Sequence, residues 1–161
     1  DKAFDRFDRL RHADGGTPTA ELRLEMQQTM QQDAAVFRAS DTLKNGVEKM
    51  TTVAGKMADI KVTDHSLVWN SDLMETLELT NLMPNALATV RSAEARTESR
   101  RAHAHEDHGE RDDKNWRVHT IARVADEKVD LSYRPVIEAP LTEEKAGGIN
   151  LKKIAPKERT F

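Results

Sequence analysis

The sequence predicts a mainly α protein: an antiparallel three-helix bundle followed by a small β-hairpin and an extended C-terminal tail. Three apolar stripes at helical spacing, separated by short polar breaks, occupy residues 20–101. Two β-prone segments come next, and prolines and glycines punctuate the remainder. At 161 residues the chain fits one domain, divided into a linker (1–19), the bundle (20–101), and a charged loop, hairpin and tail (102–161).

The first predicted helix begins at Pro18 or Thr19, because the linker ends on the helix breaker Gly15-Gly16-Thr17-Pro18-Thr19. Glutamines fill its expected wet face. The residues of its apolar stripe recur at helical spacing and are Leu22, Met26, Met30, Ala34 and Phe37.

Ser40 or Asp41 is expected to cap the second helix, since either side chain can accept from free backbone amides. Gly46 and Gly55 fall off its apolar stripe and weaken it slightly. The stripe itself consists of Leu43, Val47, Met50, Val53, Met57 and Ile60.

The third helix is expected to start near Ser71 and to run to about Arg100, with a kink at Pro84. Trp69 precedes it and is expected to pack against its first turn as a hydrophobic staple. The dry side of this helix is formed by Leu73, Leu77, Leu82, Leu87 and Val90.

After Arg100 the pattern changes. Residues 104–113 are polar and predict a loop, and Arg117–Val124 and Val129–Tyr133 predict the two strands of a hairpin. The segment from Pro135 onward lacks periodicity, so we expect an extended tail that lies on a partner surface.

Composition excludes several classes of function. The formal charge of -3 comes from 25 basic and 28 acidic residues, so nothing indicates a nucleic-acid binder. The apolar runs are only a few residues long, which argues against direct membrane insertion. Without cysteine the chain has no thiol chemistry and no cysteine-ligated iron–sulfur cluster. The sequence also lacks G-x-G-x-x-G, the phosphate-cradling turn of dinucleotide-binding domains.

Histidines and carboxylates gather in His103-Ala104-His105-Glu106-Asp107-His108, which could be read as a divalent metal site. No second cluster completes such a site, so we expect His103 to hydrogen-bond within a polar loop and expect no metal. Arg100, Arg111, Asp112 and Asp113 could similarly bind a carboxylate or transfer protons, but such runs more often form ion-pair networks.

The segment Glu98–Trp116 reads E-S-R-R-A-H-A-H-E-D-H-G-E-R-D-D-K-N-W. It resembles a segment near the end of the succinate dehydrogenase and fumarate reductase flavoprotein subunits, and L-aspartate oxidase has a looser version. Four further stretches look like the succinate dehydrogenase branch, so the resemblance covers essentially the whole chain in order. They are Ala20-Glu21-Leu22-Arg23 with Met26-Gln27, Trp69-Asn70-Ser71-Asp72-Leu73 with Glu75-Thr76-Leu77-Glu78-Leu79, Tyr133-Arg134-Pro135-Val136 and Arg159-Thr160-Phe161.

The resemblance implies the C-terminal helical domain of a subunit that oxidises succinate to fumarate and passes electrons via FAD to an iron–sulfur subunit and quinone. It implies FAD in the full-length subunit and neither cofactor-binding nor catalytic residues in this fragment, because the family's functional residues lie upstream. The fragment would then be an inactive piece of a larger chain that docks on the flavin-binding domain. The family's location implies a peripheral subunit on the cytoplasmic face of a bacterial inner membrane or the matrix side of a mitochondrial one. We expect the structural and interface positions to be Arg100, His103, Arg111, Asp112, Asp113 and Trp116.

Two departures from the family pattern fall in the same segment. Arg101 stands where the family usually has glycine, and His108-Gly109 replaces an aromatic–proline pair. If the family's helix ending is kept, Arg101 adopts a strained positive φ. Two alternatives are a freestanding helical interaction module that lost the enzyme, and the C-terminal domain of the related fumarate reductase or L-aspartate oxidase.

Overall fold

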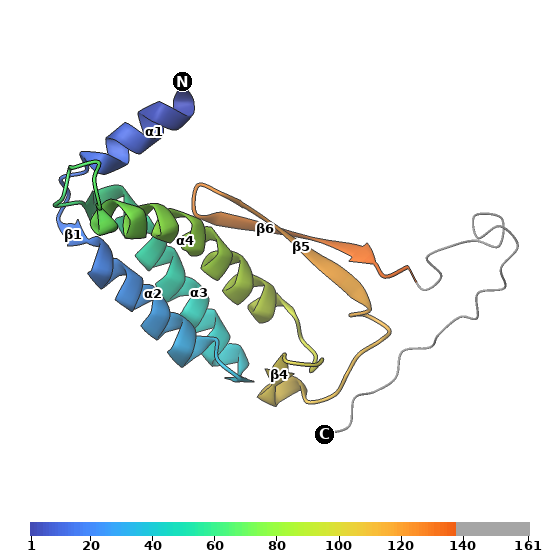
Figure 1. Ribbon diagram of the computed structural model, residues 1–161. Helices are drawn as coiled ribbons and strands as arrows, with labels where there is room; N and C mark the ends of the chain where they lie inside the picture. The colour runs from blue at the N-terminus through green and yellow to red at the C-terminus, as the bar shows by residue number, and fades with distance from the viewer. Residues whose placement is uncertain (138–161) are drawn as a thin grey trace, which may run out of the picture.

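The computed structural model describes residues 1–137; the predicted tail beyond them lies outside the described residues (Figure 1). The helices are α1 (Lys2–Arg11), α2 (Thr19–Asp33), α3 (Ser40–Gly55) and α4 (Ser71–Ala95), with 3-10 turns η1 (Lys56–Asp59) and η2 (Glu106–His108). The strands are β1 (Thr17–Pro18), β2 (Phe37–Arg38), β3 (Ile60–Lys61), β4 (Ala104–His105), β5 (Val118–Ala125) and β6 (Lys128–Pro135).

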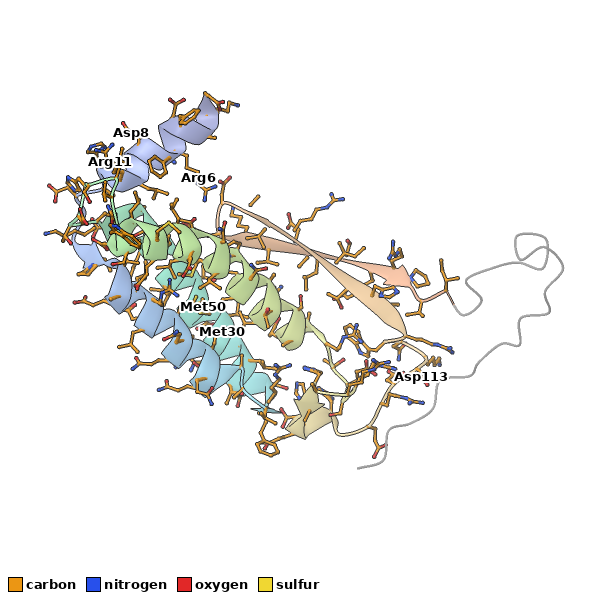
Figure 2. All side chains as sticks on the ribbon, viewed as in Figure 1. Arg6, Asp8, Arg11, Met30, Met50 and Asp113 are labelled. Carbon is orange, nitrogen blue, oxygen red and sulfur yellow. The ribbon has the colours of Figure 1, made fainter. Side chains whose placement is uncertain are left out.

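The predicted fold class is confirmed: α2, α3 and α4 lie beside one another and alternate in direction, and the β5–β6 hairpin follows (Figure 1). Met50 of α3 is fully buried between the helices (Figure 2). A single buried hydroxyl pair, Thr19 with Thr76 at 2.6 Å, joins α2 to α4. The apolar core comprises Leu22, Met26, Ala34, Leu43, Met50, Val53, Ala54, Ile60, Leu79, Met83, Leu87, Val90 and Ala93.

Residues 1–19 are not only a linker, because they contain α1. The Asp1 carboxylate caps this helix by accepting from the Ala3 amide at 3.1 Å. Two arginines then tie α1 to the bundle: Arg6 donates to the Thr80 hydroxyl at 2.9 Å, and Arg11 donates to the His65 carbonyl at 2.6 Å (Figure 2). Sequence reasoning missed the helix because its ten residues are mostly charged.

The expectation that Phe37 belongs to the helical core is wrong. Helix α2 ends at Asp33, whose carboxylate is held by Asn45 at 3.1 Å and Lys49 at 2.9 Å. Phe37 lies in β2 and is 76% exposed.

The N-terminus of α3 also differs from expectation. Its N-cap residue is Ala39, so neither Ser40 nor Asp41 caps the helix. The Ser40 amide instead donates to the carboxylate of Asp107, in the charged loop, at 2.8 Å.

Gly46 lies on the buried face of α3, where an added Cβ would come within 2.9 Å of the Asp33 Cβ. The interpretation that Gly46 lies outside the apolar stripe is therefore wrong.

Helix α4 contains Pro84, but it ends at Ala95 instead of reaching Arg100. Its cap is Asn70, whose side chain accepts from the Leu73 amide at 2.8 Å. Leu82, expected in the core, is 40% exposed, because the buried row passes through Thr76 and Leu79. The buried residues of α4 are Leu73, Thr76, Leu79, Met83, Leu87, Val90 and Ala93.

Three two-stranded sheets complete the fold. β1 pairs with β3, and β2 pairs with β4, both in parallel. The two pairs lie at opposite ends of the bundle. β5 and β6 pair antiparallel from Val118 with Pro135 to Ala125 with Lys128. Their two-residue turn, Asp126–Glu127, has positive φ at both positions, as a type I′ turn requires.

Candidate docking site around Glu98

Glu98 is the centre of the charged segment and is completely buried, at 0% exposure. Its carboxylate accepts hydrogen bonds from Arg96 Nη1 at 2.6 Å and from Arg100 Nε and Nη2 at 2.7 and 3.0 Å. The Asp112 amide donates a further bond at 2.9 Å. Four donors therefore surround one carboxylate at the exit from α4.

Burial by itself would raise the pKa of Glu98. The hydrogen bonds from Arg100, the Asp112 amide and Arg96 outweigh that effect and hold the pKa of Glu98 below its ordinary value. The bond to Glu98 in turn raises the pKa of Arg100 despite desolvation. Both groups are thus charged at neutral pH.

The ion pairs continue from Glu98 to the other end of the loop. Arg100 Nη2 donates to Asp113 Oδ1 at 2.7 Å, and Arg111 Nη2 donates to Asp113 Oδ2 at 2.9 Å. Asp113 lies between α4 and the hairpin, as Figure 2 shows. Its pKa is lowered, chiefly by the bond from Arg100. We call this set, Arg96, Glu98, Arg100, Arg111, Asp112 and Asp113, the Glu98 cluster.

Asp112 shapes the turn that leads to Trp116. Its Oδ1 accepts from the amides of Lys114 and Asn115, both at 3.0 Å, and its Oδ2 accepts from the Asn115 side chain at 2.7 Å. These bonds lower the pKa of Asp112, with the Asn115 side chain as the largest cause. The side chain thus substitutes for backbone partners in the turn.

Trp116 fastens the start of the hairpin to the end of α4. Its indole N–H donates to the Thr97 hydroxyl at 3.0 Å, and its ring meets Tyr133 edge-on at 5.6 Å between centroids. The Arg96 guanidinium lies 5.0 Å from the Trp116 ring centroid. Arg96 also donates to the Val118 carbonyl at 2.9 Å, so it connects Glu98 to β5.

His103 is fully engaged in the same region. Its Nδ1 lies 2.8 Å from Arg38 Nη1, and its Nε2 lies 3.0 Å from the Arg96 carbonyl. An arginine can only donate and a carbonyl can only accept, so the ring is neutral with its proton on Nε2. Desolvation lowers the pKa of His103, and burial likewise lowers that of Arg38.

His105 is 3% exposed, and its Nδ1 has no hydrogen-bond partner. Its ring lies 4.7 Å from that of His108, and desolvation lowers the pKa of His105. Asp107 is already occupied by the Ser40 amide. Within residues 1–137 no three histidine or carboxylate side chains are placed to hold a metal ion.

All six residues predicted from the sequence take part in this network, and their contacts are with other parts of the same domain. Their role at an interface remains a prediction. Sequence reasoning missed Glu98 as the centre, together with its donor Arg96 and the His103 partner Arg38. The available signal was the alternation of opposite charges at Arg96, Glu98 and Arg100, which favours ion pairs between near neighbours.

Arg101 has φ 56, so the predicted positive φ is present, but not as a helix ending. The Arg100 amide donates to the His103 carbonyl at 2.8 Å, and the His103 amide donates to the Arg100 carbonyl at 3.0 Å. These bonds close a four-residue turn from Arg100 to His103, in which Arg101 is the second residue. Positive φ at that position alone is the type II′ pattern, in which glycine is preferred.

Fold and site together define a helical accessory domain whose buried ion cluster fixes the joint between bundle and hairpin. Among the described helices, none is both long and apolar enough to cross a membrane. The family model described as fumarate reductase flavoprotein C-term matches residues 23–161. The chain belongs to this flavoprotein family and corresponds to its C-terminal domain.

Individual relatives agree with this assignment. The chain is 47% identical to a succinate dehydrogenase flavoprotein subunit of Rickettsia bellii, over 100% of this chain and 26% of the relative. It is 45% identical to the mitochondrial subunit of Oryza sativa, over 100% of this chain and 25% of that one. A solved E. coli quinol fumarate reductase structure superposes with a TM-score of 0.81 at 33% identity, covering 88% of this chain and 25% of that one. The chain therefore spans about a quarter of the length of these curated relatives.

Proposed function

We propose that this chain is the C-terminal helical domain of a succinate dehydrogenase flavoprotein subunit. In the full-length subunit, FAD would accept the electrons of succinate oxidation and pass them to an iron–sulfur subunit and then to quinone. The observation that carries the proposal is the match of the entire chain to subunits of this name at 45–47% identity.

We expect no flavin site among the described residues of this domain. The sequence has no G-x-G-x-x-G turn, and the charged side chains of the Glu98 cluster are bonded to one another. FAD is therefore expected on the part of the subunit that precedes this domain. The contribution of this chain is structural: it presents a rigid surface to the flavin-binding domain.

The Glu98 cluster supplies that rigidity. It holds the loop after α4 against the start of the hairpin through charged hydrogen bonds, which are stronger than neutral ones. We propose that Arg111 and Asp113 of this cluster, together with the neighbouring Trp116, face the flavin-binding domain. The complex would be peripheral, on the cytoplasmic face of a bacterial inner membrane or on the matrix side of a mitochondrial one.

Fumarate reduction is the second candidate activity for the full-length subunit. The likeness to the E. coli quinol fumarate reductase, with a TM-score of 0.81, favours it. The whole-chain relatives named succinate dehydrogenase favour succinate oxidation.

The test uses the full-length subunit purified with its iron–sulfur partner. We expect a bound flavin absorption band and succinate-dependent reduction of an artificial electron acceptor that is faster than fumarate reduction by a reduced dye. Faster fumarate reduction would support the second candidate. A subunit without flavin and without either activity would contradict both and support a freestanding interaction module.

A further inference from the structure

Large apolar side chains gather on the surface where α1 meets the start of α4. Leu67, Val68 and Trp69 precede α4 and are 66%, 72% and 98% exposed. Phe7 of α1, Leu67, Trp69 and Met74 of α4 line one groove of about 430 Å³. We call these residues, together with Phe4 one turn from Phe7, the Trp69 surface. Apolar patches of this kind on a soluble chain mark a contact with another molecule or domain.

The loop that carries Trp69 is held firmly in this exposed position. Trp69 has φ 54, in the left-handed region that side chains with a Cβ disfavour. The Asn70 side chain keeps it there by donating to the carbonyls of Asp64 at 2.5 Å and Ser66 at 2.9 Å while capping α4. A strained conformation that its surroundings over-determine indicates a functional constraint.

A second hydrogen-bond set anchors the beginning of the same loop. The Asp72 carboxylate accepts from the Thr63 amide at 2.7 Å, the Thr63 hydroxyl at 2.9 Å and the Asp64 amide at 3.3 Å. These bonds lower the pKa of Asp72 although burial raises it. The loop is thus fixed at both ends, and Trp69 is presented on a rigid support.

Helix α1 offers the matching half of the surface. It has no buried residue, although Phe4, Phe7 and Leu10 recur at helical spacing. Arg6 and Arg11 hold it beside α4 and the loop through the Thr80 hydroxyl and the His65 carbonyl. Leu10 packs in part against the core, whereas Phe4 is 74% exposed beside the exposed loop before α4.

The occupant is indicated by the length of the relatives and by the course of the chain. About three-quarters of each curated relative lies outside the match, and the family model places this domain at the C-terminal end. In the full-length subunit proposed above, the preceding polypeptide would join this domain at α1, whose N-terminal end projects beyond the bundle (Figure 1). It reaches the domain at the helix that forms half of the Trp69 surface.

We propose that the Trp69 surface is where the preceding part of the same flavoprotein subunit packs, with Trp69 inserted as the central anchor. This inference rests on the proposed function. Tryptophan is the side chain most enriched among the residues that dominate binding energy at interfaces. The docking contact is thereby assigned to the α1 end of the bundle, in addition to the contact proposed at Arg111, Asp113 and Trp116.

The test places a photoreactive benzoyl-phenylalanine at position 69 of the full-length subunit in its complex. Irradiation, digestion and mass spectrometry then identify the residues joined to it. We expect an intrachain cross-link to a peptide that precedes Asp1. A cross-link to the iron–sulfur subunit, a cross-link to a second copy, or no cross-link at all would overturn the proposal.

Phe37 provides the matched control, because it is an exposed aromatic residue in β2, which pairs with β4 at the other end of the bundle (Figure 1). The same photoreactive residue at position 37 is expected not to join the peptide captured from position 69. Capture of the same peptide from both positions would overturn the assignment to the Trp69 surface.

Flavin content and succinate-dependent dye reduction of the unmodified subunit are measured first. Their absence would contradict the proposed function. Normal flavin and activity with a cross-link elsewhere would contradict only the Trp69 surface.

Discussion

Arg100 grips the carboxylate of Glu98 through two hydrogen bonds, 2.7 Å from Nε and 3.0 Å from Nη2, at a place that solvent does not reach. The two residues are only two positions apart, so these bonds fix the backbone at the bend around Glu98. Arg100 also donates to Asp113, so the bond between Arg100 and Asp113 closes the loop that separates these two residues. The buried negative charge is compensated only while these donors remain.

Glu98→Gln is expected to lower the free energy of unfolding by about 3 kcal/mol, because it leaves the cluster's arginines without their buried counter-charge. Chemical denaturation of the two forms measures the difference. Glu94→Gln is the control: Glu94 pairs with Arg91 in a partly exposed position and should change stability by less than about 1 kcal/mol. Equal losses of unfolding free energy in the two variants would show that the burial of Glu98 does not increase its contribution to stability.

Arg101→Gly is expected to stabilise the chain by up to about 1 kcal/mol, because glycine adopts the positive φ of this turn without a steric penalty. Arg101→Ala separates this effect from loss of the charge, since alanine keeps the Cβ and should stabilise little. Thermal melts of the three forms decide. A lower midpoint for the glycine form than for the alanine form would refute the strained turn.

Gly15→Ala is expected to destabilise by about 2 kcal/mol, because an added Cβ would lie 2.1 Å from the Asp59 carbonyl oxygen and push the backbones apart. Gly55→Ala is its counterpart in α3, where a Cβ meets nothing within 4 Å. That change should stabilise the helix by roughly 0.5–1 kcal/mol. Urea midpoints of both variants test the pair, and shifts of the same sign would refute the contrast.

Acidification below about pH 6.5 is expected to weaken the fold through His103 and His105. Both have a pKa below the ordinary value in the fold, so the unfolded chain binds more protons between the folded and unfolded values. Stability therefore falls as pH drops through that window, by at most about 1.4 kcal/mol per pH unit for each histidine. Glu98, whose pKa is also lowered, adds a further loss at pH values below about 4.

Denaturant melts at a series of pH values measure this slope. His105→Phe removes one buried titrating ring and should flatten the slope below about pH 6.5. An unaltered slope in the His105 variant would argue against the assignment.

The bundle could be predicted from the sequence because its signal is local: Leu22, Leu43 and Val90 recur on one face of their helices, and all three are buried. Trp69 could not be placed in this way. The hydrophobic-staple interpretation predicted that Trp69 packs against the first turn of the following helix and is wrong, because Trp69 is 98% exposed. Amphipathic pattern does not distinguish burial within a domain from burial against another one.

Only some members of the site could be predicted, and neither its centre at Glu98 nor its geometry was among them. His103 and Trp116 were chosen for their residue types and for a resemblance, and both bond within the domain. Arg38 could not be found, since it lies 65 residues before its partner His103. Likewise the Ser40 amide, at the start of α3, donates to Asp107, which lies 67 residues later, and no local rule predicts such a partner.

The long separation between Ser40 and Asp107 also sets an order of events during synthesis. Closing a loop of this length costs chain entropy before any contact compensates for it, so contacts between nearby segments form first. Because the ribosome releases the chain from its N-terminus, α2, α3 and α4 emerge and can pack before residue 107 emerges. The charged loop therefore settles onto a nearly finished bundle, and a nascent chain stalled so that only the residues before 107 have left the ribosome should already protect the amides of Leu43 and Met50 from hydrogen exchange.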